Sequence, residues 1–389
     1  MSGVIMSHPT GNANVRAVLA ALDRDQLLDT FYTTVGLRSG GFLQRTMPRS
    51  FRGRAQRRAY EIEHGHIVFH PLREMLRLIG CGNIDAVYAD LDQHVAAQLA
   101  SQHLEASAVY CYEDGALETF RAAQALGMTR FYDLPIAYWE TSQRLLREEV
   151  ERLPAWEPTL VGTRDSQEKL ARKTEELELA NVVICPSRFV EESLPAAVRA
   201  SRMCVRAEFG SPIVGAARSR GIDSSSNSTP LRVLFAGSMT QRKGLADVFA
   251  AMKLLNRSDV QLVVMGSPVA PLDFYRKELA IFEYEPPRPH AEVLALMQRC
   301  DVFVLPSLVE GRALVQQEAM ACGLPLIVTA NAGGDDLIEE GGTGFLIPIR
   351  APEKIAEKIA WFADHRDALP AMREATQRKA VSYTWERYG

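Results

Sequence analysis

Short apolar runs alternate with amphipathic stretches along the second half of the chain. Four runs, at residues 231–237, 260–266, 301–307 and 324–330, are separated by stretches with helical spacing, such as 243–255. Apolar runs of this length favour fully buried strands, and strands that alternate with helices indicate a parallel sheet covered on both faces. We therefore predict a doubly wound α/β domain in this half.

The first half repeats this rhythm less regularly. Its expected strands lie at residues 3–9, 29–36, 107–114, 130–136 and 181–187, with charged or amphipathic helices between them, the first at 14–24. The sequence therefore predicts a second Rossmann-like domain, and we expect the two domains to face each other across a cleft.

A change in composition marks the boundary between these domains. Residues 219–230, SRGIDSSSNSTP, are rich in Ser, lack apolar periodicity and end in Pro, as linkers do. We predict an N-terminal domain at 1–218, a linker at 219–230 and a C-terminal domain at 231–370, followed by a helical segment at 371–389.

The overall composition argues against several classes of protein. The chain has 389 residues and a formal net charge of −4, so nothing global favours nucleic acid as a partner. No window approaches the length of a membrane span, and the N-terminus lacks the features of a secretory signal. Six cysteines are scattered without a C-x-x-C pair, which is typical of reduced thiols in a cytoplasmic protein.

Two acids mark the stretch EGRALVQQE, residues 310–318. Glu310 follows an expected strand at the edge where open parallel sheets bind ligands, and Glu318 falls inside the next helix. The N–H groups at the helix start suit a diphosphate, and each carboxylate can accept hydrogen bonds from vicinal hydroxyls. This arrangement fits a nucleoside diphosphate sugar, whereas the isolated spacing also fits a helix-capping Glu310 and a solvated Glu318.

Three segments carry a resemblance to a known family: FAGSMTQRKGL at 235–245, the stretch 301–348, and YTWERYG at 383–389. They resemble the C-terminal half of retaining family 4 glycosyltransferases, which have the GT-B fold, and the likeness covers about residues 231–388. The first half is similar only in rhythm and in a few segments. The resemblance implies metal-independent transfer of a sugar from a nucleoside diphosphate donor to a hydroxyl, with the anomeric configuration retained and no cofactor.

The resemblance also implies roles for the residues that match its motifs. Glu310 would contact hydroxyls of the donor sugar, and Glu318 would hold the ribose. The backbone amides that would meet the sugar and the diphosphate belong to Gly311, Arg312, Ala313 and Leu314. A glycine at 311 has a physical reason as well, since a missing side chain allows close approach of a ligand.

A second phosphate-binding turn is expected at GSMTQRKG, residues 237–244, which follows a strand and opens a helix. Its candidate residues are Gly237, Ser238, Arg242 and Lys243. Lys243 matches the family's phosphate-binding Lys, and we assign Lys243 and Glu310 as the catalytic residues. Ser238 stands where relatives usually carry Arg, and a hydroxyl supplies no charge; Arg242 either substitutes for that Arg or points to solvent.

The segment EYEPPRPH, residues 283–290, stands where the family places its base-binding segment. We therefore include Glu283 among the donor-binding candidates. Three prolines fix this backbone, so a stiff loop without a binding role is an equal alternative.

In this fold the N-terminal domain binds the acceptor. Gly11 and Asn12 lie in the turn after the first strand and would face the donor phosphates or the acceptor, while capping of the next helix by Asn12 or Asn14 is an alternative. Glu113 and Asp114 end a strand where many relatives carry His. They are candidates to orient an acceptor hydroxyl, and they also fit the acidic first turn of a helix.

A basic stretch at 45–58, RTMPRSFRGRAQRR, holds six Arg and no acid. Such clusters attract anionic lipid surfaces or phosphate-bearing acceptors, so we expect peripheral contact at the inner membrane face and a glycan or lipid-linked acceptor. A solvated basic loop is the alternative.

No metal site is expected. The DLD triplet at 90–92 more readily starts an amphipathic helix. His64, His66 and His70 share one strand, but His64 and His66 lack a cysteine or acid at a fitting spacing.

The resemblance favours a retaining glycosyltransferase of bacterial polysaccharide or lipid-linked glycan synthesis, which closes about the linker. The alternatives are a non-catalytic nucleotide-sugar-binding protein, which Ser238 permits, and a sugar-nucleotide epimerase on the same fold. The family's Trp-containing final segment continues as a helix that packs back on the first domain, so we expect 371–389 to return toward that domain and the closing helix to be cut short at Gly389.

Overall fold

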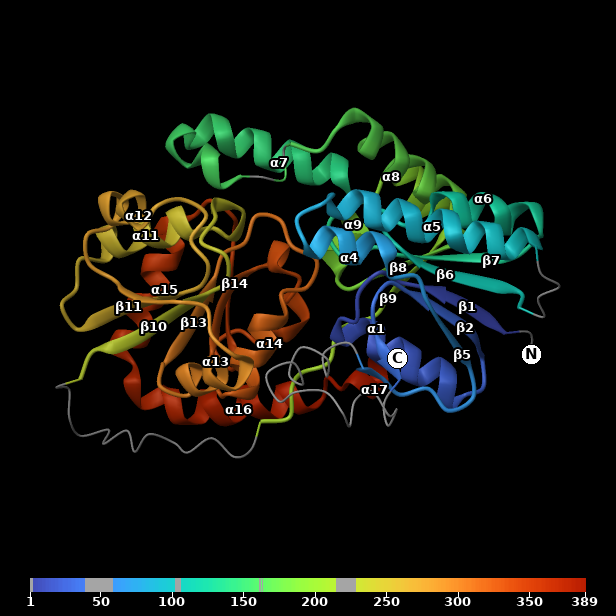
Figure 1. Ribbon diagram of the computed structural model, residues 1–389. Helices are drawn as coiled ribbons and strands as arrows, with labels where there is room; N and C mark the ends of the chain where they lie inside the picture. The colour runs from blue at the N-terminus through green and yellow to red at the C-terminus, as the bar shows by residue number, and fades with distance from the viewer. Residues whose placement is uncertain (1–2, 39–58, 102–105, 161, 163, 215–228) are drawn as a thin grey trace.

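Two parallel sheets form the framework of the protein, and Figure 1 shows them side by side in a computed structural model. The structure describes residues 3–38, 59–101, 106–160, 162, 164–214 and 229–389. The basic stretch 45–58 and most of the predicted linker 219–230 lie outside the described residues.

The N-terminal sheet has seven parallel strands in the order β5-β2-β1-β6-β7-β8-β9. Its strands are β1 (Val4–Ser7), β2 (Leu28–Thr33), β5 (His66–Phe69), β6 (Ala108–Tyr112), β7 (Thr129–Asp133), β8 (Val182–Cys185) and β9 (Met203–Arg206), and a separate pair is formed by β3 (Leu37–Arg38) and β4 (Ala59–Tyr60). The helical segments are α1 (Ala13–Arg24), α4 (Leu72–Leu78), α5 (Ile84–Ser101), α6 (Leu117–Ala125), α7 (Trp139–Arg152), η1 (Pro154–Thr159), α8 (Gln167–Leu179), α9 (Arg188–Ser193) and α10 (Ala196–Ser201).

The C-terminal sheet has six parallel strands in the order β12-β11-β10-β13-β14-β15. Its strands are β10 (Leu231–Ala236), β11 (Val260–Met265), β12 (Glu283–Glu285), β13 (Val302–Leu305), β14 (Leu326–Thr329) and β15 (Gly344–Ile347). The helical segments are η3 (Gln241–Lys243), α11 (Leu245–Leu255), α12 (Leu272–Glu278), α13 (His290–Met297), α14 (Leu314–Ala321), η4 (Ala330–Ala332), η5 (Asp335–Leu337), α15 (Pro352–Asp364), η6 (Arg366–Ala368), α16 (Leu369–Val381) and α17 (Trp385–Tyr388).

The burial of the central strands explains why the sequence pattern predicts them. Every residue of β13 and of β14 is buried, because helices cover both faces of a parallel sheet and leave no solvated side. The predicted fold class, two Rossmann-like α/β domains, is confirmed.

In each sheet there is one strand from which the chain adds later strands first on one side and then on the other. This switch point locates the part of the sheet edge where a ligand is expected to bind. β1 lies between β2 and β6, and β10 lies between β11 and β13. Ligands of open α/β sheets bind beyond the carboxyl ends of the strands at such a switch point. The turns after β1, β6, β10 and β13 are therefore the segments that the fold brings to the cleft.

Two segments cross between the domains. The segment η1, from the first half of the chain, places Trp156 in the hydrophobic core of the C-terminal domain. Residues 153–160 therefore precede the linker in sequence but pack with the domain that follows it. At the other end of the chain, α17 packs against α1 of the N-terminal domain (Figure 1). Trp385 stacks on Phe209 there, with ring centroids 6.0 Å apart.

In the described part of the chain, no helix combines the length and the apolar character needed to span a bilayer.

Candidate active site

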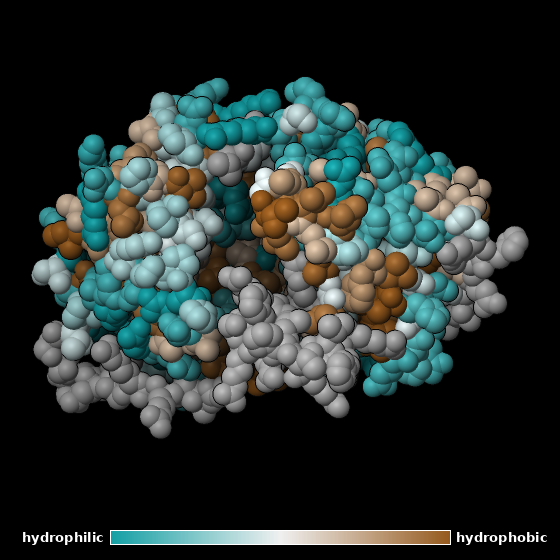
Figure 2. Space-filling view, viewed as in Figure 1, coloured by the Kyte–Doolittle hydropathy of each residue, from teal (hydrophilic) through white to brown (hydrophobic). Residues whose placement is uncertain are grey.

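A cleft of about 530 Å³ opens between the two domains at the carboxyl edges of both sheets, and Figure 2 shows the hollow between the two halves. From the C-terminal domain it is lined by Gly237, Ser238, Lys243, Glu310, Arg312, Ala313, Leu314 and Val315, and from the other side by Asn12, Ala13, Asn14, Tyr112, Pro135 and Phe209. Several sequence-predicted residues from distant parts of the chain thus share one cleft.

Lys243 and Arg242 converge on the carboxylate of Glu310. Lys243 Nζ donates to Glu310 Oε1, and Arg242 Nη1 lies 3.0 Å from the same oxygen. Burial alone would raise the pKa of Glu310, but the charges of Lys243 and then Arg242 outweigh burial and lower the pKa below its usual value. Two cations against one carboxylate leave one net positive charge, which favours an anionic ligand.

Gly237 lets the Lys243 side chain lie over the end of β10. Its φ is +144°, and a Cβ there would lie 2.9 Å from Lys243 Cδ. A larger residue would therefore be strained and would displace the ammonium group. Ser238 is exposed and lines the cleft, whereas Arg242 also donates to the backbone oxygen of Val309 at 2.7 Å. Arg242 thus points toward the site rather than away from the protein.

The first turn of α14 faces the cleft. Ala313 is its N-cap and has no side-chain capping bond, while Leu314 and Val315 line the cleft. Free N–H groups at a helix start attract anions. The amide of Ala313, in contrast, already donates to Ala332 O at 3.1 Å, so the amides after it are the better placed donors.

Two of the predicted loop residues have structural reasons of their own. A Cβ on Gly311 would lie 1.7 Å from the backbone oxygen of Pro135. The close packing of the N-terminal domain therefore explains the glycine, and the approach of a ligand is not needed to explain it. The guanidinium of Arg312 is fully buried and pairs with Asp336 at 2.7 Å, and it also donates to Gly333 O. Its side chain therefore serves to hold the loop.

The structure does not bring Glu318 or Glu283 to the described lining of this cleft. Glu318 Oε1 lies 2.9 Å from His290 Nε2 at the start of α13. Glu283 accepts hydrogen bonds from Arg232 at 2.8 and 3.0 Å, and Arg232 keeps the pKa of Glu283 below its usual value.

On the opposite wall, Asn12 is exposed, lines the cleft and forms no side-chain cap on α1. Gly11 packs under Tyr60, whose hydroxyl would lie 2.6 Å from an added Cβ. Among the described residues that line the cleft, the turn after β1 contributes Asn12, Ala13 and Asn14, and Gly11 is not one of them.

Glu113 and Asp114 are held by cations of α8 instead of facing the described cleft. Lys173 Nζ lies 2.9 Å from Glu113 Oε1 and 3.3 Å from Asp114 Oδ2, and Arg172 donates to Asp114 at 3.0 Å. Asp114 has a φ of +72°, so it forms a turn before α6. The two acids anchor α8 to the end of β6.

Other residues of the opposite wall were missed by sequence reasoning. Tyr112 is the last residue of β6 and directly precedes the turn that holds Glu113 and Asp114. Pro135 and Phe209 lie in loops without a motif, so no signal in the sequence marks them.

Backbone contacts between the domains hold the loop of the catalytic candidate Glu310. Ser187 Oγ donates to Gly311 O at 2.6 Å, and Ala137 N donates to Glu310 O at 3.4 Å. Arg188 adds an ion pair with Asp335 at 3.4 Å. The geometry of the site therefore depends on both domains.

Comparisons with known proteins find sequence similarity in the C-terminal half of the chain. Residues 222–379 match the family model described as Glycosyl transferases group 1. A putative colanic acid biosynthesis glycosyltransferase, WcaL, of Escherichia coli K12 is 27% identical over 165 residues, which are 39% of this chain and 41% of WcaL. A D-inositol 3-phosphate glycosyltransferase of Arthrobacter sp. FB24 is 31% identical over 173 residues, 40% of this chain and 39% of that protein. The chain thus spans less than half the length of these curated relatives.

Solved structures match along almost the whole chain. Sucrose-phosphate synthase from Thermosynechococcus elongatus matches with a TM-score of 0.67 at 17% identity. The match covers 100% of this chain and 96% of the chain of the synthase. Anabaena HepE in complex with UDP-glucose has a TM-score of 0.60 at 15% identity, over 99% of this chain and 96% of its own. These likenesses show the fold. Residues 222–379 therefore match the Glycosyl transferases group 1 model, and the chain has the GT-B fold of two Rossmann-like domains.

Proposed function

We propose that this protein is a retaining glycosyltransferase that moves a sugar from a nucleoside diphosphate donor to a hydroxyl acceptor. The observation that carries the proposal is the convergence of Lys243, Arg242 and Glu310 beside the first turn of α14. One net positive charge and unpaired helix amides together suit a diphosphate, and the carboxylate suits sugar hydroxyls.

In this proposal, each group has a chemical role. Lys243 and the start of α14 stabilise negative charge as it grows on the departing diphosphate. Glu310 binds hydroxyls of the donor sugar, with its ionised form maintained by the neighbouring cations. Glu318 binds the ribose, and the main chain of segment 283–290 reads the base, while the Glu283 carboxylate stays paired with Arg232. The acceptor enters from the wall formed by Asn12, Asn14 and Tyr112. The reaction needs no metal or cofactor.

HepE was solved with UDP-glucose, which supports a nucleotide sugar as the donor for this chain. The relatives named for colanic acid biosynthesis support a setting in polysaccharide synthesis. Lipid-linked glycan synthesis and a place on the cytoplasmic side of the membrane are part of the proposal. The acceptor is then a glycan or a lipid-linked glycan, and the basic stretch 45–58 provides peripheral contact with an anionic membrane.

The test is a transfer assay with labelled UDP-, GDP- and ADP-glucose and mixed glycan acceptors. Lys243→Ala and Glu310→Gln are expected to lower turnover at least ~100-fold, because each removes a group that contacts the reacting donor. Lys253→Ala, an exposed lysine on α11, is the matched control and retains activity. NMR of the product shows whether the anomeric configuration is retained.

Other outcomes of this assay would reject the proposal. Donor binding without turnover by the wild type would indicate a nucleotide-sugar-binding protein. Consumption of donor without an acceptor, with formation of a new sugar nucleotide, would indicate an epimerase.

A further inference from the structure

Helix α7 belongs to the N-terminal half in sequence but lies against the C-terminal domain. Figure 1 shows it above both domains, and the chain continues from it into η1. Trp156 of η1 packs edge-on against Phe249, Phe274 and Tyr275, with ring centroids 5.0 to 6.0 Å apart. The C-terminal end of α7 is thereby fixed against α11 and η3.

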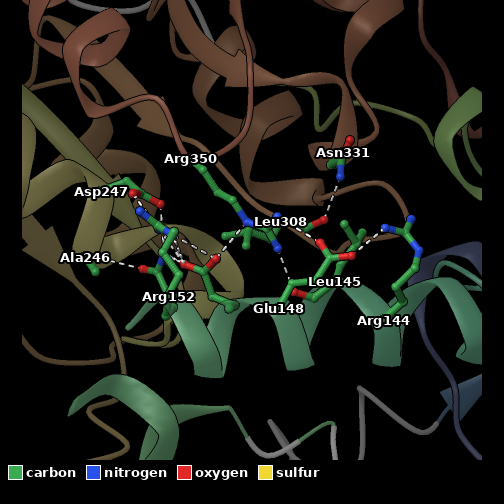
Figure 3. Close-up of polar contacts among 11 residues, drawn as sticks. Arg144, Leu145, Glu148, Arg152, Ala246, Asp247, Leu308, Asn331 and Arg350 are labelled. Carbon is green, nitrogen blue, oxygen red and sulfur yellow. Dashed lines mark hydrogen bonds and ion pairs between the residues drawn. The ribbon is translucent and has the colours of Figure 1, made fainter. Parts of the chain in front are cut away.

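A buried polar network joins α7 to the turn that carries the candidate phosphate-binding cations (Figure 3). Glu149 of α7 is fully buried and accepts from Arg350 Nε at 2.8 Å and from Gln241 Nε2 at 2.6 Å. Arg152 of α7 donates to Glu149 and, at 2.7 Å, to Asp247 of α11. The buried carboxylates of Glu149 and Asp247 are balanced in charge by two partly exposed arginines, and these hydrogen bonds compensate for the burial of the two acids.

Gln241 stands at the centre of this network. It is fully buried, and its Nε2 also donates to Asp247 at 2.7 Å, while its Oε1 accepts from Ala246 N at the start of α11. Its own N–H donates to Thr159 Oγ1 of the segment η1 at 3.1 Å. Both polar atoms of the Gln241 side chain therefore have hydrogen-bond partners, and these partners hold the side chain in one orientation.

The two residues after Gln241 are the site cations. Arg242 and Lys243 follow it in η3 and reach Glu310 across the cleft edge. A rotation of η3 would move both cations. A turn of only three residues has few hydrogen bonds of its own, so its orientation depends on contacts with the rest of the protein. The fixed side chain of Gln241 thus sets where these cations lie.

We propose that Glu149 is a positioning residue that holds Arg242 and Lys243 in place for the donor diphosphate through its hydrogen bond to Gln241. This inference rests on the proposed function, since it concerns the same phosphate site. Among the described residues, the hydrogen-bond partners of the Glu149 carboxylate are all donors, namely the Arg152, Arg350 and Gln241 side chains. An amide at this position would turn an N–H toward one of them and break the network.

The experiment measures nucleotide affinity by calorimetry with Glu149→Gln, and Glu148→Gln is the matched control. Glu148 lies next to Glu149 on α7 and pairs with Arg350 and Arg144, but its side chain has no hydrogen bond to Gln241 in the described structure. The probes are UDP, GDP and ADP with their monophosphates, and the pair with the tightest wild-type binding is used.

For Glu149→Gln we expect about a tenfold loss of diphosphate affinity and a smaller change for the monophosphate, because the β-phosphate depends most on the cations. Glu148→Gln is expected to change either affinity less than about twofold. A role in folding alone would lower the stability of Glu149→Gln without changing the ratio of the two affinities.

A second variant, Gln241→Met, keeps the length of the side chain and removes its hydrogen bonds without a change in charge. It is expected to show the same selective loss, and urea unfolding checks that it is folded. Unchanged affinity ratios in folded Gln241→Met and Glu149→Gln would overturn this inference alone. Failure of the wild type to bind any of the three diphosphates would overturn the proposed function and this inference with it.

Discussion

At the scale of single residues, the main feature is the approach of two adjacent cations to a carboxylate that lies 67 positions after Lys243 in the chain. The sequence predicts Lys243 and Glu310 as site residues through the motifs that carry the family resemblance. It leaves Arg242 open between phosphate and solvent, since water can solvate an exposed cation even where the helix dipole opposes it. The structure turns Arg242 toward Val309 O and Glu310, contacts that no local pattern encodes, and its contact with phosphate stays a prediction.

The ion cluster predicts how stability depends on pH. The lowered pKa of Glu310 means that its ionised form is favoured by folding. The stabilisation is complete above the usual glutamate pKa of 4.5 and is lost as the pH falls through the lower pKa of the folded protein. The wild type is therefore expected to lose stability relative to Glu310→Gln only below about pH 4.5. Urea unfolding from pH 3 to 7 measures this difference, and a difference that keeps growing above about pH 5 would be inconsistent with the ion cluster.

A second acid near the cleft has the opposite dependence. Burial raises the pKa of Asp133, at the end of β7, from 3.8 to about 7, so the fold favours its neutral form. Stability is present below pH 3.8 and falls as the pH rises toward 7. Replacement by Asn, which is neutral at every pH, is expected to stabilise the protein by ~1–3 kcal/mol at neutral pH and not at pH 3.5. The same unfolding series tests this, and an equal gain at both pH values would contradict the shift.

At the scale of elements, the sequence predicts most central strands because their burial is continuous, as in β13 and β14. It does not predict which domain the helical segment after β7 joins. Amphipathic spacing shows that a helix has an apolar face, but it does not identify the partner of that face. The position of η1 in the C-terminal core depends on aromatic packing between residues far apart in the chain.

This placement has a direct consequence for stability. Trp156 is 2% exposed and contacts three aromatic residues of the C-terminal domain. Trp156→Ala is expected to destabilise that domain by ~3–5 kcal/mol, because it leaves a large cavity. Glu157→Ala, an exposed neighbour, is the control and should be nearly neutral. Denaturant unfolding measures both, and a neutral effect of Trp156→Ala would show that η1 is not part of that core.

At the scale of the whole molecule, two parallel sheets meet at their carboxyl edges, and three parts of the chain tie them together: α7 with η1, the loops around Ser187, and α17. The sequence predicts two domains and a cleft from the repeated alternation of strands and helices. The contacts that set the width of the cleft could not be predicted from the sequence. They join groups such as Ser187 Oγ and Gly311 O, which lie far apart in the chain and belong to no shared motif. For the same reason, Glu113 and Asp114 fit an acceptor role in sequence, whereas the structure pairs them with Lys173.

The most direct test of this account is a crystal structure with the tightest-binding nucleoside diphosphate. The account predicts density for the diphosphate in the cleft of about 530 Å³. The terminal phosphate should lie within hydrogen-bonding distance of Lys243 Nζ and of the amide of Leu314 or Val315. A nucleotide bound elsewhere, with Lys243 still paired to Glu310 alone, would contradict the central claim.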